Sequence, residues 1–267
     1  MLRVMTWNIR TGGRDRAGPG RLDRVARVVA ERRPDLLAAQ ELRGFDSGDV
    51  LAGFAAEVGM RAHLARSRFG QPVAVLVRPP LRVVAAGPLR RPFHHAAVRV
   101  TVATDAGPLT VLGAHLDPYC GLRRRVEAGW LAAAVRRAPG ELTLLGGDLN
   151  TLDPETDHAD RIARLPPAYR RRHLRRDGRT PETRAVARLA AAGLVDLHRA
   201  LAPGDAGLTA PTRHGGGAEF SGMRLDYLFA TPALARLALS CTVQRGGETE
   251  YASDHYPVLA EFDLRPA

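Results

Sequence analysis

The 267-residue sequence predicts an α/β fold in which two packed β-sheets are flanked by helices. Short apolar runs of strand length alternate along the chain with amphipathic stretches of helical spacing. Several of these runs follow one another with Gly, Pro or Asp between them, which favours strands that pair in sequence order. The hydrophobic fraction of 45% supplies a sizeable core. No strong repeat or linker divides the chain, so we expect one domain over residues 1–267.

The N-terminal half is expected to contain two helices and seven strands. Apolar residues recur at helical spacing over Arg21–Arg33, where Pro34 provides a stop, and Val50–Val58 is expected to form a short helix. The dipeptide Gly107-Pro108 is expected to form a hairpin turn. Strands are expected at Leu2–Trp7, Leu36–Gln40, Arg61–Ala65, Pro72–Val77, Leu81–Ala86, Ala96–Ala103 and Leu109–His115.

The C-terminal half contains the clearest helix, Leu122–Arg137. Its spacing places apolar residues such as Val126 and Trp130 near one side, with Ala133 and Val135, and the arginines on the other. Residues 151–182 are polar, contain Pro and are rich in Arg, so we expect a long loop or insertion with one or two helical turns. A further helix is expected at Glu182–Ala192, closed by Gly193, and strands at Leu142–Leu145, Leu225–Ala230, Ala238–Val243 and Val258–Phe262.

The net charge of +11 suits a polyanionic partner. All 39 basic residues are Arg, however, and with the abundant Ala, Gly and Pro this is typical of a GC-rich coding bias, which weakens the argument. The clustering of charge is more informative. The stretch 161–188 favours non-specific phosphate contacts, but it is equally consistent with a solvated surface loop, and its one aromatic residue, Tyr169, is poor material for base stacking. It holds ten arginines: Arg161, Arg164, Arg170, Arg171, Arg172, Arg175, Arg176, Arg179, Arg184 and Arg188.

Several classes of protein are disfavoured by the composition. Two distant cysteines, Cys120 and Cys241, allow neither a disulfide framework nor a cysteine metal cluster. No apolar run is long enough to cross a bilayer, and the first residues read as a strand and not as a signal peptide. We therefore expect a cytoplasmic monomer with no membrane span and no obligate protein partner.

Polar residues follow several of the expected strands, and together they indicate phosphoester hydrolysis. Each residue alone is explained as a turn or capping residue. As a set they supply oxygen ligands for a hard cation, an acceptor for the proton of water, and donors to phosphate oxygens. Glu41 and Asp254 offer carboxylates and Asn8 a neutral oxygen for the metal; Asp148 takes the water; Asn150, His115 and His255 donate to phosphate; and Asp226 fixes a histidine tautomer.

In their order along the chain, these motifs resemble the endonuclease/exonuclease/phosphatase superfamily, which has the DNase I-like fold. The resemblance runs from residue 4 to about residue 262, and its most specific parts are Gly146–Asn150 and Ser253–His255. The other elements are Thr6-Trp7-Asn8, Gln40-Glu41, His115-Leu116 and Leu225-Asp226-Tyr227.

The resemblance implies a four-layered α/β sandwich of two mainly antiparallel sheets, with the site at one edge of both. It implies Mg²⁺ or Mn²⁺ at Glu41, with Asn8 and Asp254 nearby. Asp148 and Asn150 would position the nucleophilic water and the phosphate. His255, paired with Asp226, would act as general base or transition-state stabiliser, and His115 would bond the scissile phosphate or protonate the leaving oxygen. The choice of base between Asp148 and His255 stays open.

The superfamily does not fix the substrate. His115-Leu116 stands where abasic-site endonucleases have a Tyr-containing motif, which makes that role less favoured. The first hypothesis is a nuclease that cleaves a nucleic-acid backbone. The second is a phosphatase or a sphingomyelin- or phosphoinositide-type lipid phosphoesterase, and the third an inactive phosphate-binding module. Asp117, Tyr119 and Arg123–Arg125, just after His115, are expected at the surface away from substrate.

Overall fold

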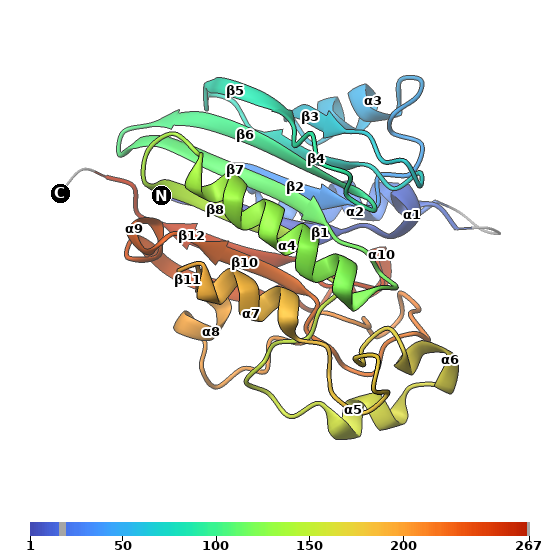
Figure 1. The fold of residues 1–267 in the computed structure, drawn as a ribbon. Helices are drawn as coiled ribbons and strands as arrows, with labels where there is room; N and C mark the ends of the chain where they lie inside the picture. Colours follow the sequence, from blue (N-terminus) through green and yellow to red (C-terminus); the bar gives the residue numbers. More distant parts are fainter. Residues whose placement is uncertain (16–19, 266–267) are drawn as a thin grey trace.

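The computed structural model describes residues 1–15 and 20–265, and two six-stranded sheets dominate it (Figure 1). The first sheet consists of β1 (Leu2–Asn8), β2 (Leu36–Gln40), β3 (Arg61–Ala65), β4 (Val73–Val77), β11 (Ala238–Val243) and β12 (Val258–Phe262). Their order is β11-β12-β1-β2-β4-β3. Only β1 and β2 are parallel neighbours; the other pairs of this sheet are antiparallel.

The second sheet repeats this arrangement. It consists of β5 (Val83–Pro88), β6 (Ala96–Thr104), β7 (Gly107–His115), β8 (Leu142–Asp148), β9 (Val195–Asp196) and β10 (Asp226–Ala230). The order is β5-β6-β7-β8-β10-β9, and β7 and β8 form its one parallel pair. Both sheets are therefore mixed but mainly antiparallel, as the sequence predicts.

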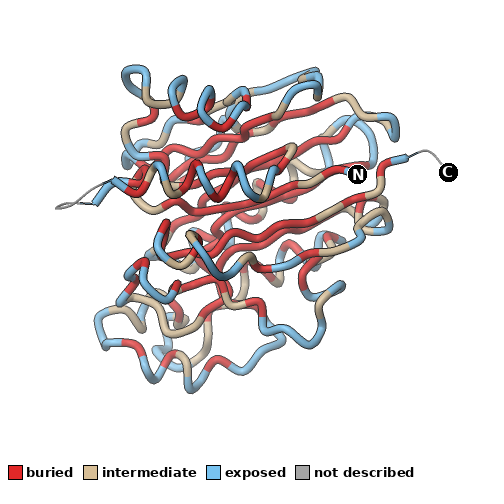
Figure 2. The backbone as a smooth tube through the Cα atoms, turned by 180° about the vertical axis from the view of Figure 1, so that it is seen from behind, coloured by how far each residue is buried: buried red, intermediate tan, exposed pale blue. Residues whose placement is uncertain are grey.

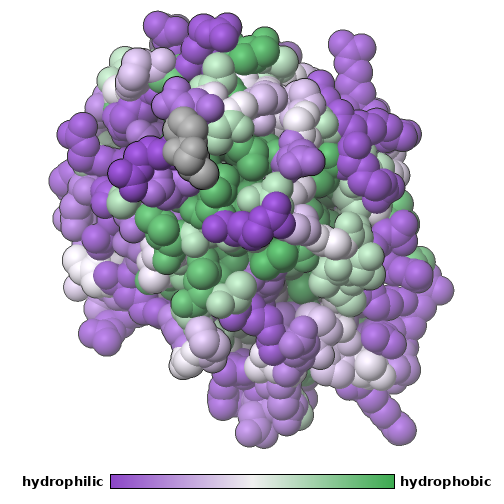
Figure 3. Space-filling model, turned by 90° about the vertical axis from the view of Figure 1, so that its left-hand side faces the viewer, coloured by the Kyte–Doolittle hydropathy of each residue, from purple (hydrophilic) through white to green (hydrophobic). Residues whose placement is uncertain are grey.

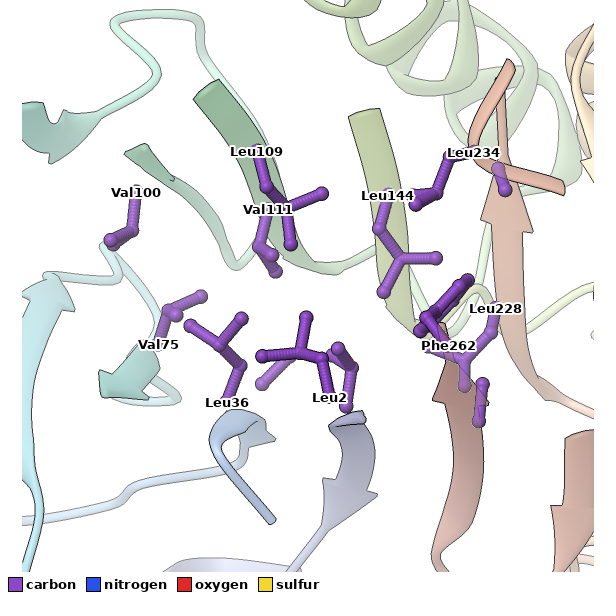
Figure 4. Packing of buried hydrophobic residues seen from close by; sticks show 14 of the residues in the cluster. Leu2, Leu36, Val75, Val100, Leu109, Val111, Leu144, Leu228, Leu234 and Phe262 are labelled. Carbon is purple, nitrogen blue, oxygen red and sulfur yellow. The ribbon is translucent and has the colours of Figure 1, made fainter. Parts of the chain in front are cut away.

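Helices cover the outer faces of both sheets, which gives four layers. Branched and aromatic side chains such as Leu36, Val75, Val111 and Leu144 fill the space between the sheets (Figure 4). A second apolar cluster joins the first sheet to α2 (Leu22–Arg32) and α3 (Val50–Glu57). A third joins the second sheet to α4 (Gly121–Arg136) and α7 (Arg184–Ala191). Burial follows the strands and the inward faces of the helices (Figure 2), so the predicted four-layered sandwich is confirmed.

The segment 151–182 is a long connection with two short helices, as expected: α5 (Ala159–Arg164) and α6 (Pro167–Arg170). A small apolar cluster that includes Leu152, Ile162 and Leu225 holds it against the end of the second sheet. Short elements that the sequence did not indicate are α1 (Arg10–Gly13), α8 (Leu197–Leu201), α9 (Pro232–Ala235) and α10 (Thr249–Ala252).

The turn of the β6–β7 hairpin differs from the one that the sequence predicts. The β6–β7 hairpin is present, but Asp105 and Ala106 form its turn, and Gly107 and Pro108 already belong to β7. The hydroxyl of Thr104 donates to the carbonyl oxygen of Gly107 at 2.6 Å and so closes the tight loop. Gly107 has φ near +103°, which a residue with a side chain rarely adopts, and this explains why glycine stands at the strand's first position.

The buried face of α4 also differs from the prediction. Val126 is 44% exposed, whereas Arg124 and Glu127 are fully buried together with Ala128 and Leu131. Arg124 donates from Nη1 to the backbone carbonyl oxygen of Asp117 at 3.1 Å. The predicted face is therefore only partly right. Trp130 and Val135 pack against the third apolar cluster, but Val126 does not. Charged groups can be buried when they have hydrogen-bond partners.

The two chain ends lie at one end of the sandwich, and Figure 3 shows hydrophobic side chains gathered on that face. The strands β1, β2, β7 and β8 all run away from it (Figure 1). Among the residues that the structure describes, no helix is long and apolar enough to span a membrane.

Candidate active site

Strand direction brings the predicted site residues together at the end of the sandwich opposite the chain termini. The parallel strands β1 and β2 end there with Asn8 and, directly after β2, Glu41. In the other sheet, His115 pairs with Asp148 in parallel register, and Asp148 pairs with Asp226 at the start of β10. Parallel strands present their carboxyl ends at one edge, so both sheets contribute there. The structure places all eight predicted residues at this edge: Asn8, Glu41, His115, Asp148, Asn150, Asp226, Asp254 and His255.

Asp148 lies at the centre of this group. Its Oδ2 accepts a hydrogen bond from Nδ2 of Asn8 at 3.0 Å and lies 3.4 Å from Nε2 of His115 and 4.0 Å from Nε2 of His255. Its Oδ1 accepts from the backbone N–H of Asn150 at 2.9 Å. Although burial opposes ionisation, the hydrogen bond with His115 and the charge of His255 hold the pKa of Asp148 well below its usual range. Asp148 is therefore a buried carboxylate surrounded by donors.

The glycine before Asp148 is required by close packing. A Cβ atom on Gly147 would lie 2.0 Å from the backbone oxygen of Ala114 in β7. The backbone of β7 cannot move away to make room for such an atom. Glycine therefore allows the end of β8 to lie close to β7, which places Asp148 beside His115.

His255 and Asp226 form a buried pair. Nδ1 of His255 lies 2.7 Å from Oδ2 of Asp226, which directs Nε2 toward Asp148. Burial alone lowers the pKa of His255, but the neighbouring carboxylate of Asp226 raises it well above the usual value. The indole N–H of Trp7 donates to the backbone oxygen of His255 at 2.8 Å and fixes the loop before β12. The ring orientation of His255 is thus set from both sides.

Glu41 and Asp254 provide the carboxylates that fit a divalent cation. Oε2 of Glu41 accepts from the backbone N–H of Thr11 at 2.9 Å and from Nε2 of Gln71 at 3.2 Å. Burial first, and also the charge of Glu41, raise the pKa of Asp254 to about 6, while Arg10 approaches it only to 3.5 Å. Asp254 is buried and Glu41 half-buried, and the charge of His255 opposes the rise in the pKa of Asp254. Two neighbouring carboxylates are hard oxygen donors of the kind that Mg²⁺ or Mn²⁺ prefers.

Asn8 uses its side chain differently from the expectation, whereas Asn150 keeps a donor for the expected role. Nδ2 of Asn8 faces the carboxylates of Glu41 and Asp148, at 3.2 and 3.0 Å, while its Oδ1 accepts from the backbone N–H of Arg10 at 2.9 Å. In this arrangement the oxygen expected to bind metal is already in use, and Asn8 links the two carboxylates as a donor. Asn150 donates one amide hydrogen to the backbone oxygen of Leu116 at 3.1 Å, which leaves its second hydrogen for another acceptor.

A cavity of about 430 Å³ opens above these residues, and several of its lining residues were missed. His95 stacks on the ring of His115 with centroids 4.2 Å apart, and burial lowers its pKa to about 2, so it is neutral. His94 places Nδ1 3.1 Å from Oδ2 of Asp117. Both histidines directly precede β6, whose first residue, Ala96, pairs with His115. Their position next to this strand is the sequence signal that could have identified them as residues of the site.

For the residues just after His115, the sequence predicts a position at the surface, away from substrate. Tyr119 is exposed but lines the cavity, whereas Asp117 and Arg124 are buried. Arg172, from the Arg-rich stretch, and Phe69 also line it.

Glu127 binds two backbone segments beside the cavity, and its removal is expected to destabilise the fold. Its carboxylate accepts from the backbone N–H of His94 at 2.6 Å and from that of Asp117 at 2.9 Å. Glu127→Gln replaces one acceptor oxygen by an amide that faces a donor, so we expect a loss of about 1–3 kcal/mol in the free energy of unfolding. Urea denaturation measures it. The exposed Glu141→Gln is the matched control, and equal stability of the two variants would contradict this role.

Three solved structures illustrate the likeness of the whole fold. An AP endonuclease from Archaeoglobus fulgidus matches with a TM-score of 0.72 and 21% identity, covering 98% of this chain and 100% of that one. The 3′ phosphatase NExo from Neisseria, bound to a product DNA hairpin, gives 0.71 and 21% over 98% and 100% of the two chains. Truncated TDP2 from Caenorhabditis elegans gives 0.67 and 20% over 98% and 96%.

The sequence itself matches a family model. No curated protein matches the chain significantly in sequence. The model of the Endonuclease/Exonuclease/phosphatase family, however, matches residues 5–255, a span that contains the strand ends from Asn8 to His255 described above. The chain therefore belongs to the endonuclease/exonuclease/phosphatase family.

Proposed function

We propose that this protein is a divalent-metal-dependent phosphodiesterase that cleaves a nucleic-acid backbone. Family membership indicates a phosphoester hydrolase. The observation that carries the finer proposal is the position of Asp148, which is ringed by His115, His255 and Asn8 and linked through Asn8 to Glu41. Such a site offers a proton acceptor, phosphate donors and a metal-ligating carboxylate, that of Glu41, in one cavity.

Each residue has a role in this proposal. Mg²⁺ or Mn²⁺ held by Glu41 and Asp254 would neutralise charge on the bound phosphate. Asp148 orients the attacking water and accepts its proton, because it is the carboxylate that faces the histidines and the cavity. Asn8 positions Asp148.

The histidines and Asn150 face the phosphate in this proposal. His255, held by Asp226 through Nδ1, directs Nε2 toward the phosphate oxygens and stabilises their growing charge. Asn150 donates its second amide hydrogen to the phosphate. His115 hydrogen-bonds the scissile phosphate or donates a proton to the leaving oxygen.

Two further observations support a nucleic-acid substrate. The chain carries a net charge of +11, and the arginines Arg43 and Arg172 line the cavity. One of the similar structures is named as an AP endonuclease, and another as a 3′ phosphatase bound to a product DNA hairpin.

A substrate panel tests this proposal. We expect plasmid DNA, single-stranded DNA or RNA to be cleaved at rates far above those for sphingomyelin, inositol phosphates or a bis-aryl phosphodiester. Raising the salt concentration should weaken nucleic-acid binding steeply, because each phosphate contact releases a counterion. Turnover of a phosphomonoester with no cleavage of any nucleic acid would show that the nuclease assignment is wrong and favour a phosphatase.

A further inference from the structure

A second and larger cavity, of about 800 Å³, lies beside the active site, and four arginines are among the residues that line it. It is bounded by the start of α4 and by residues 171–184, within the Arg-rich stretch. Tyr119 lines this cavity as well as the active-site cavity, so the two adjoin at its side chain. The charged residues that line it are Arg171, Arg175, Arg176, Asp177, Glu182 and Arg184.

The positive charge of this arginine cavity is only partly neutralised. Glu182 pairs with Arg184, and Asp177 closes its own turn by accepting from the backbone N–H groups of Arg179 and Thr180. Arg171, Arg175 and Arg176 have no carboxylate within 4.0 Å over residues 1–15 and 20–265.

Arg175 also carries an unused donor. Its Nε atom is buried and has no hydrogen-bond partner among the described residues. A buried donor without a partner is costly, and an anion with acceptor oxygens would satisfy it.

Aromatic side chains surround the junction between the two cavities. Tyr119 is 61% exposed and Phe69 is 57% exposed, although large aromatic side chains are usually buried. The ring of Phe69 stacks on His94 with centroids 4.3 Å apart, and the guanidinium of Arg172 lies 5.1 Å from the centre of the Tyr119 ring. Exposed rings beside unpaired arginines are the combination that binds single-stranded nucleic acid, with bases on the rings and phosphates on the cations.

We propose that the two cavities form one groove for a single-stranded nucleic acid. The scissile phosphate lies at Asp148, a neighbouring base stacks at Tyr119 or Phe69, and flanking phosphates occupy the arginine cavity. This inference rests on the proposed nuclease function and adds to it a preference for single strands that extend past the scissile bond. The sequence argued against stacking because the Arg-rich stretch has few aromatic residues; the fold supplies them from elsewhere.

Removal of the arginines tests the groove directly. The variant with Arg171, Arg175 and Arg176 all changed to Ala is compared with a control in which Arg136, Arg137 and Arg236 are changed, three exposed arginines outside both cavities. Binding of a labelled single-stranded DNA of about 20 nucleotides is followed by fluorescence anisotropy in EDTA, where no cleavage interferes. We expect at least about 10-fold weaker binding, and a log–log salt slope smaller by about 2, from roughly 0.7 per phosphate contact.

Substitution of Tyr119 tests the stacking. Tyr119→Ala is expected to raise KM for the oligonucleotide about 10-fold, and Tyr119→Phe to restore it, since stacking needs the ring and not the hydroxyl. This increase in KM for the oligonucleotide should exceed by far any change in turnover of a bis-aryl phosphodiester, which has no flanking base.

The outcomes separate this inference from the proposed function. If the wild type cleaves no nucleic acid, the nuclease function itself is wrong. If it does, but the arginine variant binds like the control, or a duplex competes as well as the single strand, the groove is wrong and the function stands. Melting temperatures equal to that of the wild type confirm that each variant is folded. If the variant with three arginines changed to Ala is not folded, a variant with the same arginines changed to Gln is used in its place.

Discussion

Chelation of divalent cations with EDTA will abolish phosphodiester hydrolysis by this protein, and Mg²⁺ or Mn²⁺ will restore it. Glu41 and Asp254 already repel one another in a largely buried site, and Asp148 adds another negative charge nearby. A phosphodiester brings a further negative charge into the same cavity, and a bound divalent cation would offset it together with Arg10, 3.5 Å from Asp254, and the charge of His255. The measurement is the initial rate with a bis-aryl phosphodiester before chelation, after it, and after metal is returned.

Substitution of a metal ligand makes this prediction specific to the site. Glu41→Gln is expected to raise the Mg²⁺ concentration for half-maximal activity at least about 10-fold, because even partners outside the ligand shell change metal affinity by that factor. Glu57→Gln, an exposed position at the end of α3, should leave it unchanged. A full rate in the presence of EDTA would contradict the metal dependence.

Asp148→Ala and His255→Ala are each expected to lower kcat at least about 100-fold, the usual effect of removing one acid–base group or one donor to a developing charge. Asp148→Ala removes the proton acceptor for water, leaves His115 without its carboxylate partner and leaves Asn8 with Glu41 alone. His255→Ala leaves the buried carboxylate of Asp226 unpaired. Single-turnover rates with the bis-aryl phosphodiester separate these effects on chemistry from effects on product release.

Two controls exclude a general loss of structure. Asp148→Asn keeps the shape of the side chain and removes only the carboxylate, so it should be as inactive as Asp148→Ala. Asp105→Ala, in the exposed β6–β7 turn, should retain the wild-type rate. Circular dichroism confirms that each variant is folded.

Much of the fold follows from local patterns. Strands such as Leu36–Gln40 are fully buried and consist mostly of one apolar run, and the α2 helix shows a repeating apolar face that ends at Arg33 before Pro34. The site edge was predictable for the same reason, because polar residues interrupt the sequence just where buried strands end. Asn8, Glu41 and His115 all occupy such positions.

What the sequence did not reveal depends on contacts between distant segments. Arg124 and Glu127 are buried with backbone groups of Asp117, His94 and Arg172 as their hydrogen-bond partners, and no local pattern encodes those partners. The orientation of Asn8 depends in the same way on Glu41 and Asp148, which lie far along the chain.

The aromatic residues around the cavity could not be predicted for the same reason. Phe69, His94 and Tyr119 come from three separate loops and gather only in the folded molecule. The eight site residues were predictable as a set, but their individual hydrogen bonds were not.

A double-variant cycle on kcat, with Asp148→Ala, His255→Ala and both together, tests whether these strand ends form one catalytic site. Residues that act as a unit show strongly non-additive losses. We expect the double variant to be only slightly slower than the slower single variant, with each single variant at least about 100-fold below the wild type. Wild-type turnover in either single variant, or losses that multiply in the double variant, would show that Asp148 and His255 do not act in one catalytic site.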